Sequence, residues 1–168
     1  SLGTQNISRK TEFKASWDVP YKQGTLMAIR KNNSGHSDTC YLKTSGNPYS
    51  IRLIPEKVTM IADRQDICFI IVEIVDKSGQ NVPYANNLVT FDIKGEGKLL
   101  AVGNGDPTSL ESYQQPYRKA YEGKCLLVVK SSDKEGQIKV EAKSRGLKTN
   151  EITLINSKSA AHNRRLTD

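Results

Sequence analysis

Hydrophobic and polar residues alternate along most of the chain, and a period of two is typical of β-strands. In residues 13–21, apolar side chains occupy every second position, and Pro20 ends the run because it has no N–H for a sheet ladder. This pattern predicts a strand with one buried face, and it assigns Trp17 and Tyr21 to the core. No segment keeps the apolar stripe of an amphipathic helix.

Two shorter segments, residues 25–30 and 39–43, flank the turn-forming residues 32–35 and predict a β-hairpin. Residues 44–48 (TSGNP) then indicate a linker. A few strands with one tryptophan make a small core, so either this region packs on the rest of the chain or its remaining strands precede the first residue. We favour the second alternative and interpret residues 1–46 as the C-terminal part of a first immunoglobulin-like domain.

A second series of strands follows the linker, with glycine-containing turns between them. We expect strands at residues 50–54, 58–62, 67–76, 88–93, 98–102, 121–131, 137–143 and 150–155. Short, regularly spaced strands are the signature of a β-sandwich. The predicted fold class is therefore all-β, with immunoglobulin-like β-sandwich domains in tandem and the first one incomplete at its N-terminus. Residues 47–156 form the second domain, and residues 157–168 a polar tail in which Ala160, Ala161 and Leu166 permit a short helical turn.

Composition supports a globular chain and excludes several function classes. The 168 residues, 36% hydrophobic and 26% charged, suffice for two sandwich domains. The net charge of +7 comes from 25 scattered Lys and Arg residues, so we interpret it as solvated strand faces and expect no nucleic-acid partner. No apolar run approaches the roughly 18 residues of a membrane helix, and the first residues lack the apolar segment of a signal peptide. We expect no membrane insertion.

The cysteine and histidine residues do not indicate a metal site. Cys40, Cys68 and Cys125 form no CxxC pair, and His36 and His162 lie in a predicted turn and in the tail. We therefore predict no metal and no cofactor.

Two stretches of the chain resemble family 2 glycoside hydrolases of the bacterial β-galactosidase kind, in the domains that follow the catalytic barrel. The first comprises residues 1–4 (SLGT), 17–21 (WDVPY) and 24–26 (GTL). The second comprises residues 72–79, 82–83, 89–91, 103–109 (GNGDPTS), 117–120 (YRKA) and 123–126 (GKCL). Within the second stretch, the matches from residue 72 to residue 91 are common to many bacterial immunoglobulin-like modules. Those from residue 103 onward are much more specific to the accessory domain of these glycosidases.

The resemblance implies a parent enzyme that hydrolyses terminal β-linked sugars and is exported to the periplasm or the cell surface. The catalytic barrel of such an enzyme takes about 250 residues, and no helical crossovers are visible in this sequence, so we expect the barrel to be absent here. The partner that the resemblance implies is the barrel of the parent chain, with carbohydrate involved only indirectly.

Asp106, Glu111 and Glu122 are the carboxylates nearest the glycosidase-like loop. An acid/base pair needs a partly dry pocket that separates two pKa values, and this loop is too polar to supply one. We therefore predict no catalytic residue and interpret Asp106 and Asn104 as stabilising a turn. A calcium ion held by these two side chains and by carbonyl oxygens is the alternative.

Aromatic side chains offer a further candidate site, because the C–H face of a sugar packs well on a flat ring. Trp17 and Tyr21 share the predicted apolar face of one strand and belong to the core. Tyr113 and Tyr117, in a loop with Gln and Pro, are better candidates for exposed contacts. We favour packing against a neighbouring domain of the parent for these two tyrosines, with sugar binding as the alternative.

Cys68 and Cys125 lie in strands expected to be B and F of an immunoglobulin-like fold, and alternation with outward Glu73 and Lys130 turns both inward. The inter-sheet disulfide of antibody domains joins equivalent places, and an exported protein could form it. Free buried cysteines are the favoured alternative, because no Trp occupies the strand between them. Cys40 has no evident partner.

The predicted function is a non-catalytic accessory region of a family 2 glycoside hydrolase that hydrolyses O-glycosidic bonds. It is expected to pack on the barrel or to frame the rim of the active-site cleft. A carbohydrate-binding module and an adhesin-like surface repeat are the alternatives.

Overall fold

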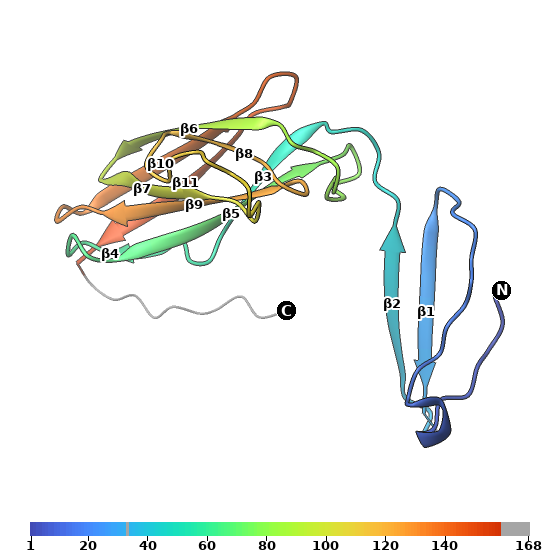
Figure 1. Cartoon of the computed structure of the whole chain (residues 1–168). Helices are drawn as coiled ribbons and strands as arrows, with labels where there is room; N and C mark the ends of the chain where they lie inside the picture. The colour runs from blue at the N-terminus through green and yellow to red at the C-terminus, as the bar shows by residue number, and fades with distance from the viewer. Residues whose placement is uncertain (33, 159–168) are drawn as a thin grey trace. The chain divides into compact units, whose positions relative to one another are not determined.

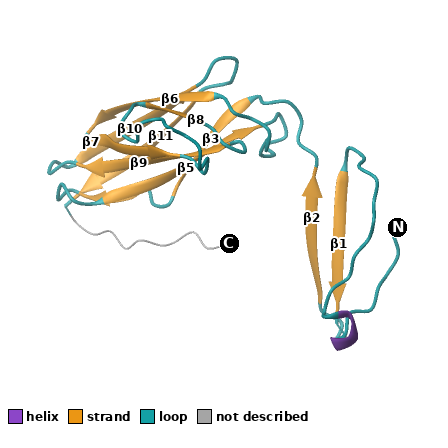
Figure 2. Ribbon diagram, in the orientation of Figure 1, coloured by secondary structure: helices purple, strands orange, loops and turns teal. Residues whose placement is uncertain are grey.

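The computed structural model describes residues 1–32 and 34–158. Nearly all regular structure in these residues is β-strand (Figure 2), which confirms the all-β prediction. The chain divides into two compact units, Ser1–Thr44 and Ser45–Asp168, and the boundary lies inside the predicted linker. Among the described residues, no helix has the length and the hydropathy to span a membrane.

The first unit is organised around one antiparallel hairpin. Strands β1 (Thr25–Lys31) and β2 (Ser37–Lys43) pair with Thr25 opposite Lys43, which confirms the predicted hairpin. A short 3-10 turn, η1 (Arg9–Thr11), precedes them. Within residues 1–32 and 34–44 no side chain is buried. The assignment of this unit to an immunoglobulin-like domain stays a prediction.

The strand predicted at residues 13–21 is wrong. Trp17 and Tyr21 are 44% and 81% exposed, and the segment has no strand partner among the described residues. It is held instead by Gln5, whose side-chain amide donates to Ser16 O (2.6 Å) and accepts from Ser16 N (3.2 Å). Alternation indicates which face of a strand would be buried, but a strand also needs a neighbour, and that neighbour cannot be read from the segment itself.

The second unit is a sandwich of two sheets (Figure 1), with the orders β3–β5–β9–β7 and β4–β11–β10–β6–β8. The strands are β3 (Ser50–Pro55), β4 (Thr59–Ile61), β5 (Ile67–Val75), β6 (Leu88–Gly95), β7 (Gly97–Gly103), β8 (Tyr117–Lys119), β9 (Lys124–Ser131), β10 (Gly136–Lys143) and β11 (Asn150–Ser157). Taken in order, the first sheet corresponds to strands A, B, E and D of the immunoglobulin fold, and the second contains strands G, F and C. Strands β4 and β11 pair in parallel, and a single parallel bridge joins Ser50 to Lys148.

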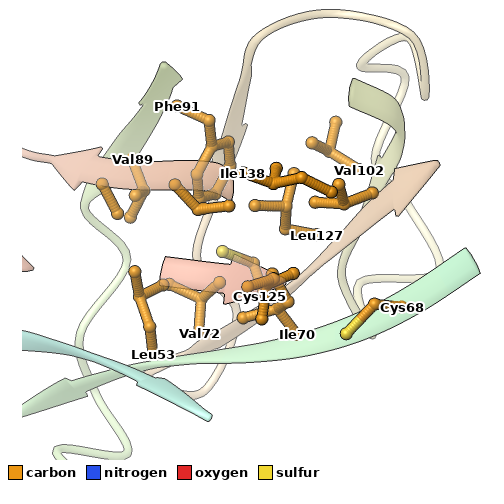
Figure 3. Packing of buried hydrophobic residues seen from close by; sticks show 14 of the residues in the cluster. Leu53, Cys68, Ile70, Val72, Val89, Phe91, Val102, Cys125, Leu127 and Ile138 are labelled. Carbon is orange, nitrogen blue, oxygen red and sulfur yellow. The ribbon is translucent and has the colours of Figure 1, made fainter. Parts of the chain in front are cut away.

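The core lies between the two sheets (Figure 3) and draws on both of them. Alternate residues point inward on each strand, as the period of two predicted: Cys68, Ile70 and Val72 on β5 face Ile138 and Val140 on β10. All five are at most 1% exposed. Burying such a side chain stabilises the fold by about 1.5–3 kcal/mol, which makes this cluster the main source of stability.

Three details of the second unit differ from the sequence prediction. Strand β8 was not predicted, because three residues are too few to show a period. The strand predicted at residues 121–131 starts only at Lys124, because Glu122 (φ 51°) and Gly123 (φ 74°) form a tight turn. The last strand extends to Ser157, and Asn156 is buried inside it. The rest of the predicted tail, from residue 159, lies outside the described residues.

Candidate functional site

The glycosidase-like residues 104–109 lie in a loop, residues 104–116, that folds around Arg118 on the neighbouring strand. Arg118 lies on β8 and is 1% exposed. Its Nη1 donates to Glu111 O (2.9 Å), its Nη2 donates to Asn104 Oδ1 (2.8 Å), and its Nε lies 3.6 Å from the Glu111 carboxylate. Hydrogen bonds from a buried guanidinium to both halves of the loop hold it in one conformation.

The loop is further ordered by turns of its own. Asp106 Oδ1 accepts hydrogen bonds from the Thr108 hydroxyl (2.7 Å) and the Thr108 N–H (2.9 Å), and these bonds lower the pKa of Asp106. Asn104 Nδ2 donates to Lys119 O (2.8 Å), while Asn104 Oδ1 also accepts from Asp106 N–H (3.2 Å). Asp106 and Asn104 therefore stabilise a turn, as the sequence interpretation held.

The same contacts decide against the calcium alternative. Asn104 Oδ1 accepts a hydrogen bond from Arg118 Nη2 (2.8 Å), so the oxygen that a calcium ion would bind already faces a positive charge. Within the described part of the chain, no group of three or more His, Cys, Asp or Glu side chains could hold a metal.

The candidate carboxylates have structural contacts that do not suit acid/base chemistry. Glu111 pairs with Arg118 and accepts a hydrogen bond from Lys119 N–H (3.3 Å). Glu122 occupies the left-handed position of a tight turn. A general acid needs a raised pKa, whereas the pKa of Asp106 is lowered. This geometry gives the three carboxylates no shared chemical role.

The two candidate tyrosines belong to different elements. Tyr113 lies in the loop, with its ring 5.1 Å from the Arg118 guanidinium, and it is 63% exposed. Tyr117 is instead the first residue of β8, opposite Thr90, so its placement in a loop was wrong. Sequence reasoning missed Leu110, which is 99% exposed on the ordered loop. An isolated leucine among polar residues carries no pattern that could have marked it.

Several other glycosidase-like residues, among them Ile74, Val82 and Ala120, are buried. Ala120, Ile74, Val82 and Ala85 form a second apolar cluster, separate from the main core. Gly123 approaches it so closely that an added Cβ would lie 2.3 Å from Val82 O. These contacts indicate that the motif residues serve packing next to the loop.

Asp76 anchors the predicted linker to the second unit. Its Oδ2 accepts from Gly46 N–H (2.7 Å), and its Oδ1 accepts from Ser78 and from Gln80 N–H. Gly46 O in turn accepts from the Tyr84 hydroxyl (3.0 Å). The hydrogen bond from Gly46 N–H has the largest effect on the pKa of Asp76, and the bond from the Ser78 hydroxyl has the next largest. Together they lower this pKa to about 2.

This pKa predicts acid sensitivity. Because the folded-state pKa of Asp76 (about 2) lies below its ordinary value of 3.8, ionised Asp76 stabilises the fold above that ordinary value. The contribution is lost as the pH falls from 3.8 towards 2. Urea unfolding midpoints measured between pH 6 and 2 should fall less steeply for Asp76→Asn than for the unaltered chain. Glu151→Gln, which removes an exposed carboxylate, should leave the slope unchanged; an equal flattening in both variants would contradict the assignment.

Cys68 and Cys125 do not form the disulfide that the sequence left open. Both thiols are free and buried, and they lie apart in the core (Figure 3). Their strands are neighbours in one sheet, and Cys125 is opposite Val72, four positions from Cys68. At about 3.4 Å per residue they are too far apart to bond. Cys125 therefore lies on strand E, and its assignment to strand F was wrong. Burial raises the pKa of the Cys125 thiol to about 12.

Comparison with known proteins bears on this site directly. A family model described as glycoside hydrolase family 2 C-terminal domain 5 matches residues 51–153, a range that contains the loop and Arg118. Beta-galactosidase BoGH2A of Bacteroides ovatus is 36% identical over 147 residues, which are 86% of this chain and 17% of that protein.

Solved structures give the same result. A glycosyl hydrolase family 2 member from Bacteroides cellulosilyticus matches 94% of this chain and 20% of its own, with a TM-score of 0.89 and 35% identity. A beta-glycosidase from Bacteroides vulgatus matches 83% of this chain and 18% of its own, with a TM-score of 0.80 and 29% identity. The chain thus spans about a fifth or less of the length of these relatives.

Proposed function

The chain belongs to glycoside hydrolase family 2, as its C-terminal domain 5, and we propose that it is a non-catalytic β-sandwich region of a longer enzyme of this family. The proposal rests on how little of its relatives the chain covers. Although 86% of the chain aligns with a β-galactosidase, the aligned residues are only 17% of that protein. A barrel of about 250 residues, which such chemistry needs, exceeds the whole chain of 168.

In this proposal the parent enzyme hydrolyses O-glycosidic bonds of terminal β-linked sugars outside the cytoplasm, and this region packs on its catalytic part. The contacts of the site support a structural role. Arg118 and Asp106 order a loop whose exposed side chains, Leu110 and Tyr113, are positioned for contact with a neighbouring surface.

The experiment is a glycosidase assay of the 168-residue chain beside the enzyme that contains it. Aryl β-glycosides are suitable substrates, beginning with the β-galactoside. We expect no turnover above buffer from the chain. In the enzyme, Asp106→Asn and Glu122→Gln should each change kcat by less than about twofold, since removal of a general acid or base would cost about 10²–10⁴-fold. Turnover by the chain, or a loss of that size in either variant, would refute the proposal.

Carbohydrate binding is the second candidate, and the exposed ring of Tyr113 favours it. Arg118 supports the ring through a cation–π contact, and the side chain remains 63% exposed. Affinity electrophoresis in gels containing β-linked polysaccharides tests this function. If the polysaccharide retards the chain and Tyr113→Ala abolishes this retardation, carbohydrate binding is established. If the mobility of the chain is unchanged, only the structural role remains.

A further inference from the structure

The outer surface of the four-stranded sheet is apolar, although it faces away from the core. Six side chains define this outer apolar face: Ile54, Phe69, Ile71, Ala101, Leu126 and Val128. Strand pairing arranges them in two rows across the sheet, Ile54–Ile71–Leu126 and Phe69–Val128–Ala101. Ile54, Phe69 and Ile71 are each 40–45% exposed.

The outer surface of the five-stranded sheet provides an internal comparison, and it is polar. Its central rows are Asp92–Glu141–Glu151 and Lys94–Lys139–Thr153. Both sheets belong to one sandwich and obey the same alternation, so the fold does not require an apolar outer surface on either of them. A sheet that is apolar on both faces is usually covered on both.

Charged residues border the outer apolar face, and most of them are cations. On one side, buried Glu73 pairs with Arg52 (2.5 Å) and Lys124 (3.0 Å). On the other side, Lys98 and Lys130 lie directly opposite each other on neighbouring strands. Neither lysine forms an ion pair with a described residue.

Two like charges directly opposite each other destabilise a sheet. On the other sheet Lys94 also lies opposite Lys139, but Lys94 has a counter-charge in Asp92 (3.0 Å). Lys98 and Lys130 lack such a counter-charge among the described residues. A partner with carboxylates at this position would remove that repulsion. A second copy of the face would not remove that repulsion, because its carboxylates already have partners: Glu73 pairs with Arg52 and Lys124, and Glu56 accepts a hydrogen bond from Phe69 N–H (3.2 Å). The charges therefore favour a different surface as the occupant.

We propose that the outer apolar face docks against another part of the same enzyme chain, through an apolar surface that carries carboxylates opposite Lys98 and Lys130. This inference rests on the proposed function, since the partner is the remainder of the enzyme. Covalent connection would keep that partner at high effective concentration, so a modest contact area would suffice.

Thiol labelling tests the inference. Ile71→Cys places a thiol on the outer apolar face, and Ile155→Cys places one on the other sheet at a matched exposure of 42% against 45%. Each variant is prepared as the 168-residue chain and within the enzyme, alkylated, and mapped by peptide mass spectrometry so that Cys40 does not interfere. We expect alkylation at position 71 to be at least about tenfold slower in the enzyme, and alkylation at position 155 to be equal in both. Phe69→Cys repeats the test if the first variant does not fold.

A charge variant sharpens the test. Lys130→Glu should restore most of the alkylation at position 71 in the enzyme and leave the isolated chain unaffected. Equal alkylation at position 71 in both proteins would overturn the docking inference while leaving the proposed function intact. Glycosidase turnover by the isolated chain would refute the proposed function instead. A dimer of the isolated chain that protects position 71 in sedimentation and labelling would assign the face to a second copy.

Discussion

Replacement of Gly123 by alanine is expected to destabilise the second unit by about 3 kcal/mol or more, the sum of a backbone cost and a steric clash. Gly123 has a φ of +74°, and an added Cβ would lie 2.3 Å from Val82 O. Neither Gly123 nor Val82 can move easily. Gly123 N–H donates to Ala85 O and Gly123 O accepts from Ile74 N–H, while Val82 O accepts from Ala85 N–H. Chemical denaturation followed by circular dichroism measures the loss.

Two other glycines separate the two contributions. Gly146 has a φ of +78° but no atom within 4 Å of an added Cβ, so Gly146→Ala should cost only about 1–2 kcal/mol. Gly103 has neither the positive φ nor a close neighbour, and Gly103→Ala should remain within about 0.5 kcal/mol of the unaltered chain. If Gly123→Ala costs no more than Gly146→Ala, the contact with Val82 is not a packing constraint.

Arg118→Ala should cost about 3–5 kcal/mol, because it removes a buried guanidinium together with its ion pair and its hydrogen bonds. The lost contacts are those to the Glu111 carboxylate, Glu111 O and Asn104 Oδ1. The melting temperature should fall by roughly 10 °C or more. Limited proteolysis should find new cleavage sites within residues 104–116, since the loop loses the side chain around which it folds.

Lys119→Ala is the matched control for the arginine. Lys119 is the next residue on β8, and its side chain is exposed, although its backbone pairs with Glu111 and Asn104. The substitution keeps these backbone bonds and should change stability by less than about 0.5 kcal/mol. Equal proteolysis of the loop in both variants would mean that the backbone contacts of β8, rather than the Arg118 side chain, hold the loop.

The predictions for Gly123 and Arg118 also explain why the glycosidase-like motif could be recognised in the sequence although its structural role could not. Gly123 and Arg118 have unusual surroundings, a left-handed backbone against a carbonyl and a buried guanidinium, and few other residues can replace them. Such positions form a recognisable sequence pattern. The pattern by itself does not distinguish packing from chemistry, and the hydrogen bonds were needed to assign these residues to packing.

The sequence by itself determined the class of structure. Period-two alternation and turn-forming residues are local properties, and they located the hairpin of the first unit and most strands of the second. The motifs between residues 103 and 126 also identified the family. Residues 13–21 show the limit of this reasoning, because alternation was present there and no partner strand was.

Only the tertiary structure decided which strands are neighbours, because pairing joins residues that are far apart in the sequence. That step separated Cys68 from Cys125 and placed β9 as strand E. Strand pairing also places Arg52 and Lys124 beside Glu73, which the sequence predicted to face solvent, and both cations form ion pairs with it. The pairing of β5 and β9 as adjacent strands also brings their outward apolar side chains together, and this forms the outer apolar face.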